Sequence, residues 1–140
     1  MEQKIRYTLS KTDRLKSRKV IEYLFKEGKA FSIFPLRVFY TTEFPDSAIA
    51  QNNLQVGFSV STRNFKKAVD RNRIKRLMRE AYRLQKHPLT MQIENSDKKI
   101  AFFFVYTGND IPDYKLIYEK TGNSIKRLIK ILNEDLPANN

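Results

Sequence analysis

Hydrophobic and polar positions alternate with two different periods along the chain, and these periods predict its helices and strands. Four apolar residues at helical spacing predict a short helix that begins at its N-cap Ser17 and ends at Gly28, a residue suited to the left-handed position after a helix. Strict alternation over 36–41 and again over 54–61 predicts two strands, each with one buried face.

The second half of the chain continues the pattern. Helical spacing returns over 68–86, where Pro88 ends it. Residues 100–107 are apolar on both faces and rich in aromatic side chains, which is typical of a central strand, and a last helix is predicted from Asp113 to about Glu134. We therefore predict an α+β fold, a two-layer sandwich with a mixed sheet of about four strands and three helices.

Length and composition favour one globular domain. The chain has 140 residues, of which 41% are hydrophobic, enough for a sizeable core. We expect a single domain over 1–140, with an ordered core over about 14–134 and flexible ends over 1–12 and 136–140. There is no cysteine, which excludes disulfide scaffolds and thiolate zinc sites. No apolar run is long enough for a membrane span or a signal peptide, so we expect a cytoplasmic protein without a membrane partner.

The formal net charge of +12 is concentrated in one segment. Residues 1–62 carry 10 bases and 6 acids, residues 63–86 carry 10 and 2, and residues 87–140 carry 7 of each. Two-thirds of the excess therefore lies within 24 residues. Solubility alone does not require such a concentration, which indicates a surface for a polyanionic partner.

In the predicted basic helix, apolar and cationic side chains separate onto two faces. The apolar face holds Ile74, Leu77, Met78 and Ala81, and the cationic one holds Arg71, Asn72, Lys75, Arg76, Arg79 and Arg83. Arginine can grip phosphate with two nitrogens and stack on unpaired bases. An ordinary solvated face is one alternative, although such faces mix both signs of charge. A membrane-surface helix is another, although it needs a wide, bulky apolar face.

The run A-V-D-R-N-R-I-K-R-L-M-R-E-A-Y, residues 68–82, resembles the signature of the bacterial ribonuclease P protein subunit, the basic partner of a catalytic RNA that removes the 5′ leader from precursor tRNA. Upstream, R-L-K at 14–16, V-F-Y at 38–40 and V-G-F-S-V-S at 56–61 follow in the family's order. The resemblance covers about residues 14–86. It implies an RNA-binding subunit of this endoribonuclease and a left-handed β-α-β crossover in the fold.

The resemblance also implies two groups of site residues. The RNA contacts that it implies are Arg71, Asn72, Lys75, Arg76 and Arg79, and we predict the same role for the other bases of this segment, Arg63, Lys67, Arg73 and Arg83. Phe25, Tyr40 and Ile21 line a cleft for the single-stranded leader, where aromatic rings can stack on any base. Ile21 departs from the family, which often has an aromatic residue there, and Lys66 stands where glycine is common.

Aromatic residues at helix or strand spacing are more often core than ligand platform, and this alternative stays open for Phe25 and Tyr40. The remaining aromatic residues considered are expected in the core; they are Phe31, Phe34, Phe102 and Phe104.

The sequence lacks the groups from which protein nucleases build their active sites. His87 is the only histidine and the acids are scattered, so no catalytic residue is assigned and no independent activity is expected. By the resemblance, Mg²⁺ is held mainly by the RNA subunit and is not bound stably by the protein. The expected partners are the catalytic RNA and precursor tRNA, with no small-molecule substrate. The alternative is a basic structural RNA-binding protein of ribosomal type.

Overall fold

The computed structural model describes residues 13–44 and 53–134, and the predicted flexible ends over 1–12 and 136–140 lie outside them. Within this part of the chain the order is α1 (Arg18–Glu27), β1 (Lys29–Ile33), β2 (Leu36–Thr41), β3 (Leu54–Val60), α2 (Ala68–Gln85), α3 (His87–Glu94), β4 (Ile100–Tyr106) and α4 (Tyr114–Glu134).

The four strands form one mixed sheet in the order β1-β2-β4-β3. β2 runs antiparallel to β1 and to β4, whereas β3 and β4 are parallel and are connected through α2 and α3. The α+β class is confirmed, and so is the central place of 100–107, because β4 lies between β2 and β3. The left hand of the crossover stays a prediction.

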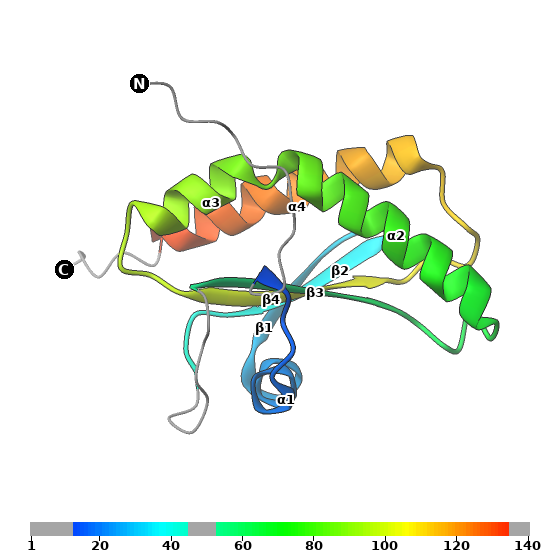
Figure 1. The fold of residues 1–140 in the computed structure, drawn as a ribbon, viewed down its shortest axis with the longest axis horizontal. Coiled ribbons are helices and arrows are strands. Elements are labelled where there is room, and N and C mark those ends of the chain that lie inside the picture. Colours follow the sequence, from blue (N-terminus) through cyan, green and yellow to red (C-terminus); the bar gives the residue numbers. More distant parts are fainter. Residues whose placement is uncertain (1–12, 45–52, 135–140) are drawn as a thin grey trace.

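Helices cover the two faces of the sheet unequally (Figure 1). α2, α3 and α4 pack on one face, and α1 packs alone on the other. The main core lies between the sheet and α2–α4, and its largest buried side chains include Tyr82, Phe102 and Phe104. A small core of Leu15, Val20, Leu24 and Ala101 lies beneath α1. α1 therefore adds a partial third layer to the predicted sandwich.

The structure confirms the predicted start of α1 but not the predicted conformation at its end. Ser17 is its N-cap, because the backbone N–H of Val20 donates to Ser17 Oγ at 3.3 Å. Gly28 is not left-handed but extended, with φ −74° and ψ 171°. A Cβ there would lie 2.3 Å from the carbonyl oxygen of Leu24 and 2.9 Å from that of Tyr40. Close approach of backbone, not an unusual φ, is what requires glycine at this position.

Two elements were not predicted from the sequence. β1 is an edge strand with mostly exposed residues, so it has almost no buried face to signal it. α3 begins at His87, directly after α2, and Pro88 lies in its first turn, where the missing N–H costs nothing. Pro88 therefore separates two helices and does not simply end one, which makes four helices in the described residues and not three.

The aromatic residues assigned to the core divide three ways. Phe102 and Phe104 are fully buried, as predicted, and Phe31 is half-buried against the main core. Phe34 is 73% exposed in the turn between β1 and β2, so its assignment to the core is wrong. A turn position has no sheet face to bury it, and the sequence did not reveal the turn because β1 was missed.

Candidate nucleic-acid interface

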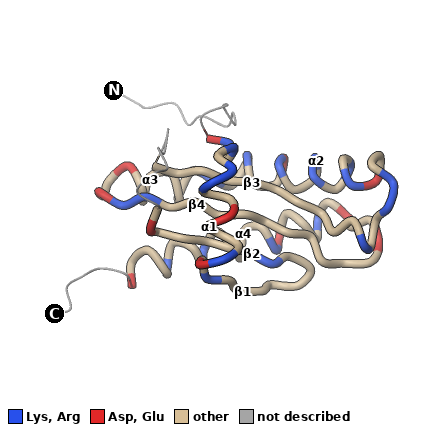
Figure 2. The backbone as a smooth tube through the Cα atoms, turned by 90° about the horizontal axis from the view of Figure 1, so that it is seen from below, with Lys and Arg blue, Asp and Glu red and all other residues tan. Residues whose placement is uncertain are grey.

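α2 carries the first of two surfaces suited to RNA. Ile74, Met78, Ala81 and Tyr82 are buried and hold the helix on the sheet. The opposite side exposes four of the predicted RNA-binding residues, here called the cationic face: Asn72, Arg73, Arg76 and Arg79. Lys75 is half-buried beside it. Figure 2 shows basic positions recurring along α2. The separation of apolar and cationic sides predicted from the helical spacing is therefore confirmed.

Two of the predicted RNA-binding arginines are engaged within the protein. Arg71 Nη1 donates to the carbonyl oxygens of Phe65 at 2.9 Å and Lys66 at 2.8 Å. Arg83 Nη2 lies 2.7 Å from Glu80 Oε2, and the hydrogen bond from Arg83 lowers the pKa of Glu80. Arg71 therefore shapes the turn before α2, and Arg83 shares its charge with a neighbour.

The connection between β3 and α2 is fixed to the body of the protein. Phe65 is buried, with its ring 6.0 Å from that of Tyr106. Asn64 Nδ2 donates to the carbonyl oxygen of Gly108 at 3.2 Å. The predicted RNA-binding residues Arg63 and Lys67 are exposed on this connection and so extend the cationic face beyond the first turn of α2.

The second surface is a cluster of aromatic rings on the α1 side of the sheet. The ring centroid of Phe25 on α1 lies 4.7 Å from that of Phe39 on β2 and 5.3 Å from that of Phe103 on β4. Phe25 is 44% exposed, and the guanidinium carbon of Arg37 lies 5.1 Å from the centroid of the Phe39 ring. We call Phe25, Phe39 and Phe103 the aromatic platform.

Tyr40 does not belong to this platform, and its role in a leader-binding cleft stays a prediction. Neighbouring residues of a strand point to opposite faces, so Phe39 faces α1 while Tyr40 packs against the main core, 6.0 Å from the ring of Phe31. Tyr40 also lines a separate cavity of about 530 Å³ with Tyr23. The V-F-Y motif contains both residues, and only the position of α1 shows which faces Phe25.

Ile21 lies beside the aromatic platform, and its role toward the leader stays a prediction. It is half-buried against the small core, one turn before Phe25, and Phe39 and Phe103 pack against the same core. Phe39 and Phe103 were missed as site residues. Phe39 of β2 pairs with Phe103 of β4 across the sheet, and this pairing would have identified both. The sequence does not reveal it, because the register between strands that are distant in sequence cannot be derived from local periodicity.

Neither surface offers the donors of a metal centre. Among residues 13–44 and 53–134, no group of three or more His, Cys, Asp or Glu side chains is placed to hold a metal ion. The same residues contain no helix that is both long and apolar enough to cross a membrane. What the two surfaces can do is bind phosphates on α2 and stack bases on the α1 side of the sheet.

Comparisons with known proteins agree with this geometry. A family model described as Ribonuclease P matches residues 9–128. The ribonuclease P protein component of Porphyromonas gingivalis is 37% identical over 122 residues, covering 87% of each chain. That of Chlorobium phaeobacteroides is 32% identical, covering 81% of this chain and 82% of its own. The structure of the RNase P protein from Thermotoga maritima matches with a TM-score of 0.58 at 24% identity, covering 81% of this chain and 96% of that one.

Proposed function

The chain belongs to the ribonuclease P protein family, and we propose that its two surfaces bind two different RNAs, the RNA subunit and the precursor tRNA. As a member, it is a subunit of an endoribonuclease that acts in tRNA processing, and its partner is the RNase P RNA. Membership replaces the alternative of a structural RNA-binding protein of ribosomal type.

The cationic face of α2 binds phosphates of the catalytic RNA in this proposal. Its support is the gathering of Arg73, Arg76 and Arg79 on one exposed side of a helix whose other side is buried. Like charges at this spacing repel one another by a few tenths of a kcal/mol per pair, and an anionic partner removes that cost. Arg71 serves by holding the turn that carries Lys66 and Lys67, and Lys75 and Arg83 lie at the edges.

The aromatic platform stacks on bases of the single-stranded leader of precursor tRNA. The observation that carries this proposal is the half-exposed ring of Phe25, whose centroid lies within 5.3 Å of those of two further rings on the sheet. Stacking accepts every base, as a subunit that serves many precursors requires, and contributes roughly 1–3 kcal/mol per base. Ile21 adds apolar contact beside Phe25.

The chemistry of cleavage belongs to the RNA in this proposal. Mg²⁺ supplies an activated water and stabilises the charge of the phosphate and the leaving oxygen. The scattered acids of the described residues do not fit such an ion, so we assign its ligands to phosphates of the RNA subunit. The protein would contribute by screening phosphate repulsion and by positioning the leader, and would thereby lower the Mg²⁺ concentration that cleavage needs.

The platform is tested with the double variant Phe25→Leu/Phe39→Leu, which keeps apolar volume but removes two stacking rings. Holoenzyme carrying it should bind precursor tRNA at least about fivefold more weakly, the lower end of the range for one stacked base, and bind mature tRNA unchanged. The measurement is the dissociation constant of each RNA at one salt concentration.

The matched control is Phe34→Leu, because Phe34 is an exposed phenylalanine outside the platform. Equal losses for precursor and mature tRNA, or the same loss with Phe34→Leu, would contradict leader stacking. Thermal unfolding of each variant separates this result from a loss of the small core against which Phe39 packs.

A further inference from the structure

We propose that Arg14, Lys16 and Arg18 form a basic strip that binds the phosphates of the leader strand between α2 and the aromatic platform. The proposal rests on the proposed function of the platform and extends it to the backbone of the same strand. The R-L-K motif at 14–16 supplies two of the three residues, and neither the cationic face nor the platform includes it.

The segment that carries the strip is docked on the edge of the sheet. Arg14 forms an isolated parallel β-bridge with Val56 of β3, and the N–H of Leu15 donates to the carbonyl oxygen of Val56 at 2.9 Å. The side chain of Leu15 is buried in the small core. Backbone and side chain together therefore hold the segment beside β3.

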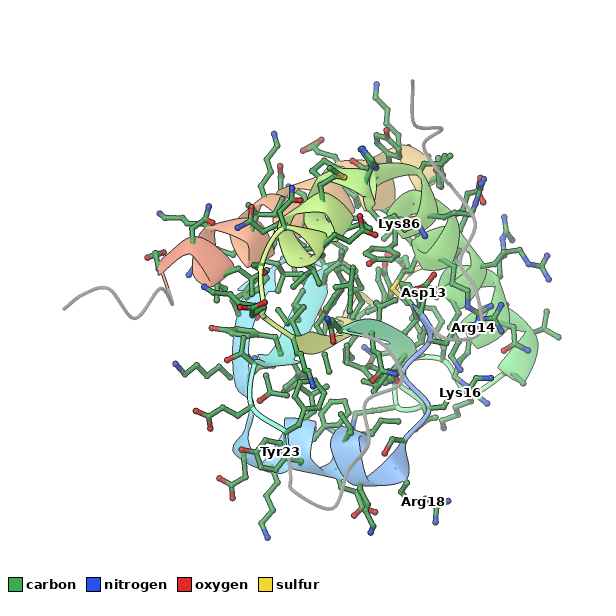
Figure 3. All side chains as sticks on the ribbon, turned by 60° about the vertical axis from the view of Figure 1, so that its left-hand side comes forward. Asp13, Arg14, Lys16, Arg18, Tyr23 and Lys86 are labelled. Carbon is green, nitrogen blue, oxygen red and sulfur yellow. The ribbon has the colours of Figure 1, made fainter. Side chains whose placement is uncertain are left out.

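An ion pair anchors the same segment at its N-terminal end, at Asp13. Asp13 Oδ2 lies 3.6 Å from Lys86 Nζ, and the side chain of Lys86 is only 10% exposed. Lys86 stands between α2 and α3, so this ion pair ties the segment to the helical layer. In Figure 3, Asp13 lies near Lys86, and Arg14, Lys16 and Arg18 follow one another from α2 toward α1.

This anchoring decides the direction of the basic side chains. With Leu15 turned inward, the exposed residues on either side of it, Arg14 and Lys16, face outward. Two residues of extended chain separate their Cα atoms by about 6.6 Å, a spacing on the scale of successive phosphates in an extended strand. The strip is therefore suited to follow a single strand of RNA.

The strip continues directly into the platform along α1. Arg18 and Phe25 are seven residues apart, so they lie within about 20° of one line on the helix and about 10.5 Å apart along its axis. Ile21 lies between them on the same side. A strand that follows the strip from α2 therefore reaches Phe25 without leaving this side of α1.

The charge of the basic strip favours RNA as its ligand, and its position favours the leader strand over the RNA subunit. Residues 14–19 contain four bases and no acid, a density that repels itself unless a polyanion is bound. The strip runs from α2 toward α1, the helix that carries Phe25. We therefore assign it to the leader and not to the RNA subunit.

The experiment compares Arg14→Gln/Lys16→Gln with the control Lys126→Gln/Lys130→Gln, which removes the same charge from exposed positions of α4 on the other side of the sheet. Holoenzymes are titrated with precursor tRNA carrying a long leader, with precursor whose leader is cut back to its last nucleotides, and with mature tRNA. Binding of the protein to the RNA subunit is measured separately.

We expect Arg14→Gln/Lys16→Gln to bind the long-leader precursor about 5- to 10-fold more weakly than the control does. The slope of log K against log salt should be flatter by about 1.4. The short-leader precursor and mature tRNA should bind to both variants equally. No difference from the control overturns the proposal, and so does a loss of RNA-subunit binding, which would assign the strip to that RNA. The variant Phe25→Leu/Phe39→Leu is measured in the same series. If it loses precursor binding while the strip variant does not, only the strip proposal fails; if neither loses binding, both proposals fail.

Discussion

At the scale of single residues, the aromatic platform depends on a glycine, Gly57, beneath one of its rings. Gly57 of β3 lies opposite Phe103 of β4, and a Cβ on Gly57 would stand 2.3 Å from the Phe103 ring. The ring therefore lies over the glycine, in the position from which it contacts Phe25. The φ of Gly57 is not positive, so the space above it, and not backbone freedom, is the reason for glycine.

Gly57→Ala should therefore move the Phe103 ring and damage the platform. We expect the free energy of unfolding to fall by about 1–3 kcal/mol, the usual cost of an added methyl group in a packed site. Precursor tRNA should bind more weakly while mature tRNA and the RNA subunit bind as before. Chemical denaturation and the three dissociation constants are the measurements.

Gly122→Ala provides the control for this change, because the added methyl group meets only the flexible end of Gln85 on the opposite face of the sheet. A Gly57→Ala protein that keeps the full preference for precursor would show that Phe103 has no part in leader binding.

At the scale of elements, α2 combines a structural role with a binding role because its two sides are chemically distinct. The buried side fixes the helix against β3 and α4, and the other side presents the cationic face. The pattern of hydrogen bonds then sorts its arginines: Arg71 and Arg83 have partners within the protein, whereas Arg73, Arg76 and Arg79 lie exposed. Salt dependence of binding should follow this division.

Replacement of Arg73, Arg76 and Arg79 by Gln should flatten the slope of log K against log salt for RNA-subunit binding by about 2–2.7, the contribution of three phosphate contacts. The fold should persist, because all three side chains are exposed. The control replaces the exposed lysines Lys115, Lys126 and Lys130 of α4 by Gln. A slope that stays unchanged in a folded triple variant would remove the cationic face from the interface.

At the scale of the whole molecule, the two proposed binding surfaces lie on opposite sides of the sheet, whereas no group of three or more His, Cys, Asp or Glu among the described residues is placed to hold a metal ion. The cationic face and the platform are held in fixed relation because α2 packs on β3 and α1 packs on β2 and β4, which are strands of one sheet. This arrangement is suited to hold a structured RNA and a single strand at the same time.

The chain refolded free of RNA should therefore not cleave precursor tRNA in Mg²⁺, because arginines stabilise phosphate charge but neither activate water nor hold the metal ion. Addition of the RNA subunit should restore cleavage at the 5′ end, at a lower Mg²⁺ concentration than the RNA needs alone. The measurement is cleavage of labelled precursor across a Mg²⁺ series.

The control for this test uses Asp70→Asn and Glu80→Gln, the two acids of the basic segment. Specific cleavage by protein alone that either substitution abolishes would make the protein an enzyme by itself and contradict the division of labour.

The sequence by itself determined the features that depend on local periodicity and charge. The helical spacing over 68–86 defined both sides of α2, and the apolar run over 100–107 identified the central strand. The N-cap at Ser17 was also readable, because capping involves residues three apart. The run at 68–82 indicated the family, because its residues resemble the signature of that family.

Only the tertiary structure decided which side chains meet across elements. Phe39 and Tyr40 are equally aromatic neighbours, and the strand pattern could not say which faces α1, because a shift by one residue exchanges the two faces of a strand. The packing of Phe103 over Gly57 and the docking of Leu15 beside Val56 join segments more than 40 residues apart. Such contacts are set by three-dimensional packing, which local periodicity along one chain does not encode.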